Sequence, residues 1–216
     1  MKKFKDEERA PGTFRRLKIF SKVFSFITIC IGLMVIAGWI LNIAFLKRAG
    51  DAIVAMNPVT AITFILTGIS LLFLLDESNA SKRKAATILS TIIVGIGLLK
   101  LSSLIADVNI PFDQLLFRGQ LYDPVIGDLN SMAPNTALNF ILIGFAMLLV
   151  DYESSGRNRP TQFICIIITL IALLSIYGYV YGVAFLYGVG SFVPMALHTA
   201  IAFLLASVGL LFARPD

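Results

Sequence analysis

The sequence predicts an all-α membrane protein in which six transmembrane helices form three consecutive helical hairpins. The first observation is composition: 57% of the 216 residues are hydrophobic, only 14% are charged, and the mean hydropathy is +0.86. The second is that the charged residues lie between apolar stretches of about 20 residues, the length that a bilayer core requires. The third is a motif that occurs three times. Each stretch is expected to be helical, because backbone polar groups must be paired inside lipid.

The apolar stretches follow one another along almost the whole chain. They cover approximately residues 23–46, 58–75, 85–106, 135–150, 161–182 and 195–212. The fourth and the sixth are close to the lower limit for a span. We expect residues 1–21 to form a basic cytoplasmic tail that rests at the lipid headgroups. Residues 22–216 are expected to form a single membrane domain.

The repeated motif begins at Met56, Met132 and Met195. It reads Met-x-(Pro/Leu)-x-Thr-Ala-(Ile/Leu)-x-Phe-(Ile/Leu)-Leu, followed after one residue by Gly or Ser. The three copies stand at the starts of the second, fourth and sixth apolar stretches. The repeating unit is therefore a hairpin of two helices, over about residues 22–76, 84–151 and 161–216. In the first copy Asn57 is a preferred N-cap and Pro58 suits the first helical turn.

The residues shared by the three copies are expected to face the interior. On a helix that turns 100° per residue, the shared Thr, Ala, Phe and small residue fall on one arc. Small residues and hydroxyls are typical of close helix contacts in membranes. We therefore expect an inner ring of three motif-bearing helices with pseudo-threefold character, with the other three helices outside it. The predicted packing seam comprises Phe64, Gly68, Phe140, Gly144, Phe203 and Ser207, with Gly178 and Gly182 of a Gly-x-x-x-Gly pattern in the fifth stretch.

Charge asymmetry predicts the orientation. Most of the 18 basic residues lie in segments that fall on one side of the membrane. These segments are the one before the first apolar stretch, the connections between the second and third and between the fourth and fifth stretches, and the end of the chain. Only Lys47, Arg48 and Arg118 fall in segments on the other side. The positive-inside rule then places both termini in the cytoplasm. The net charge of +5 therefore reflects orientation in a membrane and does not indicate nucleic-acid binding.

Polar residues at the starts of the motif helices form a candidate sensing pocket near the outer face. Polar groups inside a membrane are costly and usually face the interior or a wet cavity. The alternative is that Asn135 and His198 are helix caps or interfacial residues in contact with water. The candidate pocket residues are Asn135, Asn139, His198, Thr60, Thr136 and Thr199.

Two further features lie near the outer end. Lys100 is expected to reach outward or to pair with Asp107 or another carboxylate of the long segment 107–133. That segment is acidic but rich in Phe and Leu, so it is expected to lie on the bilayer surface or to cap the bundle.

No catalytic or cofactor motif stands out in the sequence. We find no nucleophile elbow, P-loop, HExxH or metal-ligand cluster, so no enzyme activity, metal or cofactor is expected. Haem ligation at His198 is disfavoured, because the single histidine of the chain supplies only one axial ligand.

Several phrases resemble the N-terminal polytopic membrane region of bacterial sensor histidine kinases, a type of region that also precedes diguanylate cyclase outputs. The longest are residues 132–140, which read MAPNTALNF, residues 177–182, which read YGYVYG, and residues 195–203, which read MALHTAIAF. The stretches 113–117 and 213–216 also fit. The resemblance implies a location in the bacterial inner membrane and a last helix that leads to a cytoplasmic output. It supplies no ligand-binding residues.

Residues and resemblance together favour a non-catalytic membrane input module of a signal-transduction protein. It would sense a membrane or periplasmic stimulus and relay it through the last helix to a cytoplasmic signalling domain or partner protein. The expected partners are the lipid bilayer, that output and a second copy in a homodimer. A small transporter or channel-like protein is one alternative, and a passive anchor or oligomerisation scaffold is another.

Overall fold

The computed structural model describes residues 11–106, 108, 110–153, 159–188 and 192–214, and most of these residues are helical. This confirms the predicted all-α class. The α-helices of this described part are α1 (Pro11–Ile40), α2 (Ala44–Lys47), α3 (Pro58–Leu74), α4 (Ala80–Ile105), α5 (Pro134–Leu148), α6 (Pro160–Tyr181) and α7 (Leu197–Leu211). The 3₁₀ turns are η1 (Phe112–Gln114), η2 (Arg118–Gln120) and η3 (Ala184–Leu186), and β1 (Tyr122–Asp123) pairs antiparallel with β2 (Asp128–Leu129).

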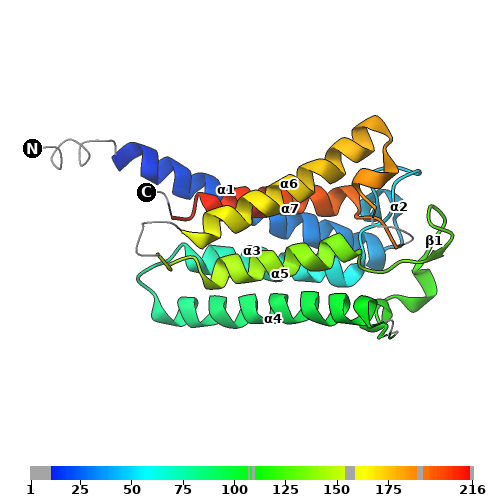
Figure 1. Ribbon diagram of the computed structural model, residues 1–216, viewed down its shortest axis with the longest axis horizontal. Helices are drawn as coiled ribbons and strands as arrows, with labels where there is room; N and C mark the ends of the chain where they lie inside the picture. Colours follow the sequence, from blue (N-terminus) through cyan, green and yellow to red (C-terminus); the bar gives the residue numbers. More distant parts are fainter. Residues whose placement is uncertain (1–10, 107, 109, 154–158, 189–191, 215–216) are drawn as a thin grey trace, which may run out of the picture.

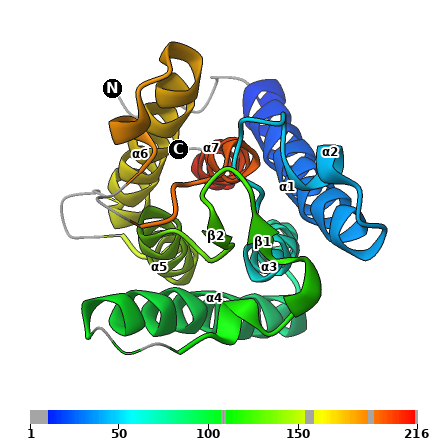
Figure 2. The ribbon, with the colours of Figure 1, turned by 90° about the vertical axis from the view of Figure 1, so that its right-hand side faces the viewer.

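The long helices run side by side along the longest axis of the molecule (Figure 1). Consecutive helices pack as hairpins, α1 with α3, α4 with α5, and α6 with α7. Seen along the bundle, α3, α5 and α7 lie in the middle, and α1, α4 and α6 lie around them (Figure 2). We call the end that carries residues 41–57, 110–133, 182–188 and 192–196 the cap end. We call the end that carries residues 75–79, 149–153, 159 and 212–214 the ion-pair end.

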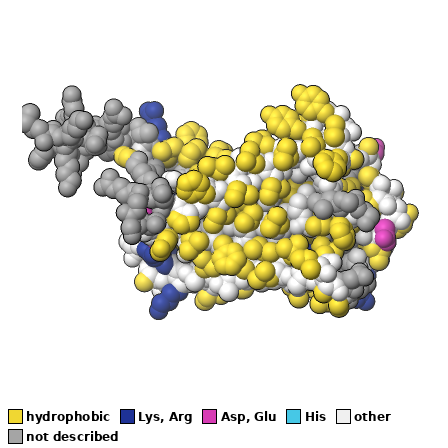
Figure 3. Space-filling view, viewed as in Figure 1, with side chains coloured by type: hydrophobic (Ala, Val, Ile, Leu, Met, Phe, Trp, Pro, Cys, Tyr) yellow, Lys and Arg dark blue, Asp and Glu magenta, His cyan; other side chains and the backbone are white. Residues whose placement is uncertain are grey.

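Helix length divides the outer helices from the inner ones. In the described part, three helices are long and apolar enough to cross a membrane: residues 14–40 of α1, all of α4 and all of α6. The inner helices α3, α5 and α7 are apolar but shorter. With 15 residues each, α5 and α7 rise only about 22 Å, less than the roughly 30 Å of a bilayer core. On the face shown in Figure 3, hydrophobic side chains cover most of the band between the two ends, and the visible Lys and Arg side chains lie toward the ends.

Extended, buried chain makes up for the shortness of the inner helices. Residues 54–57, 130–133 and 193–196 enter the bundle without helical structure, and the motif methionines Met56, Met132 and Met195 are fully or almost fully buried. Non-helical backbone at such depth requires protein partners for its polar groups. The cap end supplies these partners, as described below.

Three phenylalanines from the repeated motif meet at the centre of the bundle. Phe64 of α3, Phe140 of α5 and Phe203 of α7 are all completely buried. Their ring centroids lie 5.0, 4.6 and 4.8 Å apart, within the range of favourable aromatic contact. Side chains that occupy the same motif position therefore pack against one another along the bundle axis.

The small motif residues face the outer helices. A Cβ atom on Gly68 would come within 2.7 Å of the Ser25 carbonyl oxygen of α1, and one on Gly144 within 3.0 Å of the Ser90 carbonyl oxygen of α4. The corresponding Ser207 of α7 shares a 2.9 Å hydrogen bond with Thr169 of α6. These residues permit close packing inside each hairpin, whereas the phenylalanines pack between hairpins.

Helix α1 begins at Pro11 and continues to Ile40, so residues 11–21 of the expected cytoplasmic tail form its first turns, and their position at the lipid headgroups stays a prediction. The expectation for residues 1–10 lies outside the described residues. Gly182 is not a helix-packing residue, because it ends α6 with a φ of 67°, a conformation that glycine adopts readily. Gly178 packs closely, but against Tyr187 and Leu186 of the following segment and not against another long helix.

The phenylalanine cluster predicts a large and specific loss of stability. Phe203→Ala should lower the free energy of unfolding by about 3–5 kcal/mol, because it leaves a cavity among rings that cannot collapse into it. Unfolding of the purified chain in mixed micelles, followed by circular dichroism, measures the change. The control is Phe163→Ala on α6, whose side chain is 59% exposed. Equal losses for the two variants would contradict central packing.

Candidate functional site

The segment between α4 and α5 folds over the cap end. Asp123 accepts a 2.9 Å hydrogen bond from the Ala55 amide through Oδ2, and the Asn130 side chain donates a 2.8 Å bond to the Ala55 carbonyl oxygen. Asn57 caps α3 as predicted, accepting from the Val59 amide, and its Nδ2 donates to the carbonyl oxygen of Asp113. Of the two expected locations for this segment, capping of the bundle is therefore confirmed.

At each motif methionine, a side chain from another part of the chain forms a hydrogen bond with a backbone amide or carbonyl group. The Trp39 indole donates to the Met56 carbonyl oxygen at 2.9 Å, and the Tyr179 hydroxyl donates to the Met195 carbonyl oxygen at 2.7 Å. The Met132 amide donates to Asp113 Oδ2 at 2.6 Å. The three entry segments are thus held by residues from α1, α6 and η1.

A buried ion pair joins α4 to the cap. Lys100 Nζ lies 2.8 Å from Asp113 Oδ2, and both residues are almost inaccessible, 6% and 0% exposed. The pairing of Lys100 with a carboxylate of segment 107–133 is confirmed, with Asp113 as the partner. Asp107, the other expected partner, lies outside the described residues. Breaking such a pair from one side leaves a buried charge without compensation.

A polar cavity of about 250 Å³ opens beside this ion pair. The pair leaves hydrogen-bonding capacity next to the cavity, because an ammonium group has three donors and the buried Asp113 Oδ1 has no partner in the described part of the chain. Its size and its two opposite charges suit a small polar molecule that carries both an acceptor and a donor. The cavity is lined by Lys100, Ser103, Asp113, Gln114, Ser131 and Phe192, together with Leu104, Val108 and Ile110.

The predicted pocket residues lie elsewhere, on the first turns of the inner helices. The Asn135 side chain donates to the Tyr187 carbonyl oxygen at 3.3 Å and accepts from the Thr136 amide at 3.0 Å. Neither Asn135 nor His198 is an N-cap, because α5 and α7 begin one residue earlier. Thr60, Thr136 and Thr199 are each 2% exposed. None of these residues lines the polar cavity.

Asn139 and His198 carry unusual buried groups. Asn139 is completely buried, and within the described part of the chain neither its oxygen nor its nitrogen has a hydrogen-bond partner. His198 Nδ1 is likewise buried without a partner among those residues. Unsatisfied buried polar groups cost about 1–3 kcal/mol each, so they mark positions where the packing serves more than stability. The hypothesis that these two residues take part in sensing therefore stays a prediction.

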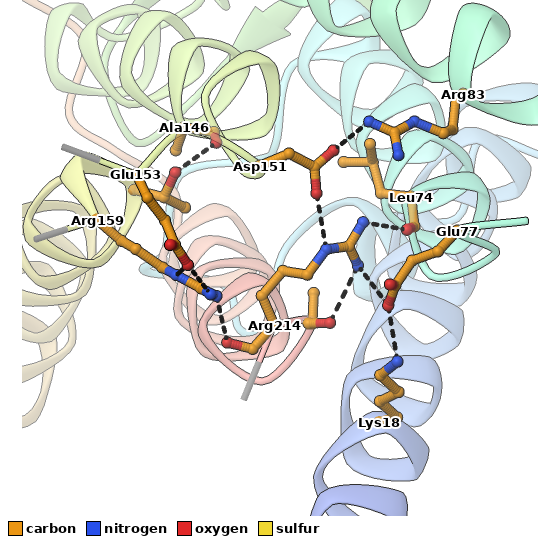
Figure 4. Close-up of polar contacts among 11 residues, drawn as sticks. Lys18, Leu74, Glu77, Arg83, Ala146, Asp151, Glu153, Arg159 and Arg214 are labelled. Atoms are coloured by element: carbon orange, nitrogen blue, oxygen red, sulfur yellow. Dashed lines mark hydrogen bonds and ion pairs between the residues drawn. The ribbon is translucent and has the colours of Figure 1, made fainter. Parts of the chain in front are cut away.

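At the ion-pair end, Arg214 joins the end of α7 to the two neighbouring connections (Figure 4). Its Nε lies 2.8 Å from Asp151 in the α5–α6 connection, and its Nη1 lies 3.5 Å from Glu77 in the α3–α4 connection. Its Nη2 donates to the Leu74 carbonyl oxygen at 3.0 Å. The guanidinium of Arg214 is suited to this arrangement, because it presents several donors in a fixed plane. We call these contacts the Arg214 network.

Further charged residues extend the Arg214 network to the outer helices. Lys18 of α1 donates to Glu77 at 2.7 Å, and Arg83 of α4 donates to Asp151 at 2.6 Å. Arg159, at the start of α6, pairs with Glu153 and donates to the Arg214 carbonyl oxygen at 3.1 Å. Every helix hairpin therefore contributes a charge.

The hydrogen bond from Lys18 lowers the pKa of Glu77, an effect that burial opposes and the nearby Arg214 reinforces. The carboxylate therefore stays ionised well below neutral pH. Its stabilising contribution is lost only as the pH falls through that lowered pKa.

Sequence reasoning did not identify the Arg214 network or the polar cavity. Arg214, Asp151 and Glu77 stand out only as charges between apolar stretches, and nothing in their spacing shows that they meet. Asp113 was part of a segment expected to cap the bundle, and its pairing with Lys100 was one of several options. In the described residues no group of His, Cys, Asp and Glu side chains is arranged to hold a metal ion.

The chain has no match among protein-family models, curated proteins or solved structures. Its resemblance to the membrane regions of sensor kinases therefore stays a prediction. A function has to be argued from the chemistry and geometry of the two ends.

The buried ion pair predicts strong coupling between its partners. Lys100→Met and Asp113→Asn should each cost about 3–5 kcal/mol of unfolding free energy, because each strands a buried charge. The double variant should be more stable than the sum of the single losses implies, by about 1–3 kcal/mol. Chemical unfolding of the four proteins in micelles measures this coupling.

The matched control is the exposed ion pair of Lys82 and Asp76, whose atoms lie at a similar separation of 2.7 Å. Lys82→Met and Asp76→Asn should couple by less than about 1 kcal/mol, since solvent screens exposed charges. A coupling at Lys100 and Asp113 no larger than at this control would contradict the structural role of the buried pair.

Proposed function

We propose that this chain is the membrane input module of a signal-transduction protein. In this proposal the three long helices α1, α4 and α6 and the three shorter helices α3, α5 and α7 all cross the membrane, as three hairpins of the same orientation, with the ion-pair end in the cytoplasm and the cap end outside. The distribution of basic residues supports this orientation. The extended entry segments support spanning by the short inner helices, because they add buried length to α3, α5 and α7.

The observation that carries the proposal is the position of α7. This helix lies among the inner helices and connects the two polar ends of the molecule (Figures 1 and 2). The segment before α7 is held by the hydrogen bond from the Tyr179 hydroxyl to the Met195 carbonyl oxygen. The segment after α7 is held by the hydrogen bond from Arg214 to the Leu74 carbonyl oxygen. A small change of packing at the cap end is therefore transmitted to Arg214 by a rigid element. Signalling of this kind requires two packing states whose balance the stimulus shifts.

The centre of the bundle favours this proposal over a transporter or channel. A pathway along the pseudo-threefold axis would pass between Phe64, Phe140 and Phe203. These rings are completely buried and in contact. A passive anchor, the other alternative, has no need of the unpartnered Asn139 or of a cavity beside a buried ion pair.

The proposed partners follow from the position of the Arg214 network. A cytoplasmic signalling domain, in the same protein or in a partner protein, would read the position of the α7 end. A second copy of the chain would form a homodimer, as signalling helices commonly act in pairs. The proposed location is the bacterial inner membrane.

A chimera tests the proposal. The chain is joined after Asp216 to the catalytic core of a histidine kinase, and autophosphorylation is measured in proteoliposomes. Arg214→Gln should change the rate by about fivefold or more, which corresponds to a coupling free energy of about 1 kcal/mol. Variants at the cap end, Lys100→Met and the pair Asn135→Ala with His198→Ala, should also change the rate at equal protein levels.

Lys82→Gln is the control, because Lys82 pairs with Asp76 at the same end and does not bind the Arg214 network. It should leave the rate unchanged. A rate that no cap-end or Arg214 variant alters would contradict the sensory proposal. Solute flux through liposomes that His198→Ala abolishes would support the transporter instead.

A further inference from the structure

A groove runs along α1 at the ion-pair end, on its side toward α3. One part, of about 420 Å³, is apolar and lies between Leu72 and the α1 residues Ile19, Lys22, Val23, Phe26 and Ile27. The adjoining part, of about 450 Å³, lies closer to the start of α1 and is lined by Phe14, Arg15, Lys18, Ile19, Lys22 and Leu75. The two parts share Ile19 and Lys22. They therefore form one groove with a basic end and an apolar continuation.

Two of the three cations that line this groove have no ion-pair partner in the described part of the chain. Arg15 and Lys22 are exposed, and no residue in the described part of the chain forms an ion pair with either. Lys18 is bound to Glu77. An apolar partner would leave the two cations unpaired, and a soluble anion would leave the apolar part uncovered. A second copy of the chain would bring identical cations together, which is unfavourable at short distance.

We propose that this groove binds one anionic phospholipid. Its phosphate lies between Arg15 and Lys22, and the start of an acyl chain fills the apolar part beside Val23 and Phe26. An amphipathic occupant of this kind satisfies both halves of the groove at once. Basic residues at the edge of an apolar surface attract anionic lipids, and each contributes measurably to binding.

The lipid site connects to the Arg214 network through Lys18. The Lys18 side chain lines the basic part of the groove, and it also donates to Glu77, which in turn contacts Arg214. An anionic headgroup competes with Glu77 for the Lys18 ammonium and so alters the charge balance at the end of α7. This regulatory consequence rests on the proposed sensory function, whereas lipid binding does not.

Native mass spectrometry of the purified full chain in detergent tests the site. Phosphatidylglycerol is titrated against phosphatidylcholine of the same acyl composition. The chain should retain one phosphatidylglycerol in preference to phosphatidylcholine. The double variant Arg15→Gln with Lys22→Gln should bind it about tenfold or more weakly, the loss expected from two headgroup contacts. Val23→Trp should also reduce retention, because it fills the apolar part and leaves the charge unchanged.

The matched control is Arg16→Gln with Lys84→Gln, which removes two charges from the same end outside the groove. It should retain the lipid as the unmodified chain does. Equal retention of both lipids, or equal losses in the two double variants, would overturn the proposal. So would a dimer that lacks bound phosphatidylglycerol and that Val23→Trp dissociates, because it would assign the groove to a second copy. Retention is measured without any signalling output, so its failure is distinct from failure of the proposed function.

Discussion

The need to satisfy buried backbone groups governs the cap end of this protein. Each inner helix starts below the surface of the bundle, so the chain before it buries peptide groups that no helix can pair. Trp39 and Tyr179 donate to two of the motif methionines, and Asp113 accepts from the third. Asp113 in turn requires Lys100 to compensate its charge. The polar cavity, the ion pair and the fold of segment 110–133 therefore follow from one constraint.

The ion-pair end follows from a different constraint. Here the chain leaves the apolar band, and charged residues are satisfied by one another and by water. Individual exposed ion pairs contribute little to stability, but a network around a partly buried arginine fixes geometry. Arg214 is only 12% exposed in its side chain and touches two connections and the end of α3. These contacts hold the end of α7 in one position. Each of them is weak enough to be replaced by another contact at a small cost in free energy.

The periodic features of the sequence predicted most of the fold. The apolar stretches located the six longer helices, except that the first helix covers Pro11–Ile40 and not residues 23–46, and the motif placed Phe64, Phe140 and Phe203 on faces that meet. The Asn57 cap was also predictable, because helix capping, like hydrophobic periodicity, depends on residues that are close together in the sequence. Residues 11–21, expected as part of a polar tail, continue into α1 because their composition is compatible with a continuous helix. The prediction that Gly182 packs between helices was wrong, because a Gly-x-x-x-Gly spacing does not distinguish a packing glycine from one that ends a helix.

The candidate sites were less predictable, because they depend on residues far apart in the chain. Asp113 lies in a segment without periodicity, and its burial follows from where that segment crosses the bundle. Arg214 and Asp151 are 63 residues apart, and only the packing of three hairpins brings them together. Sequence pattern identifies the elements that carry such residues, whereas their meeting is a property of the assembled bundle.

The membrane topology is the claim on which the functional account depends most. Single cysteines, placed in a variant without native cysteines, are labelled in intact cells with a membrane-impermeant maleimide. The account predicts labelling from outside at Asp51, Asp128 and Phe185 of the cap end. It predicts labelling at Ser78 and Tyr152 of the ion-pair end only after the cells are permeabilised. External labelling of Ser78 or Tyr152, or protection of Asp128, would contradict six spans with both ends of the bundle as assigned.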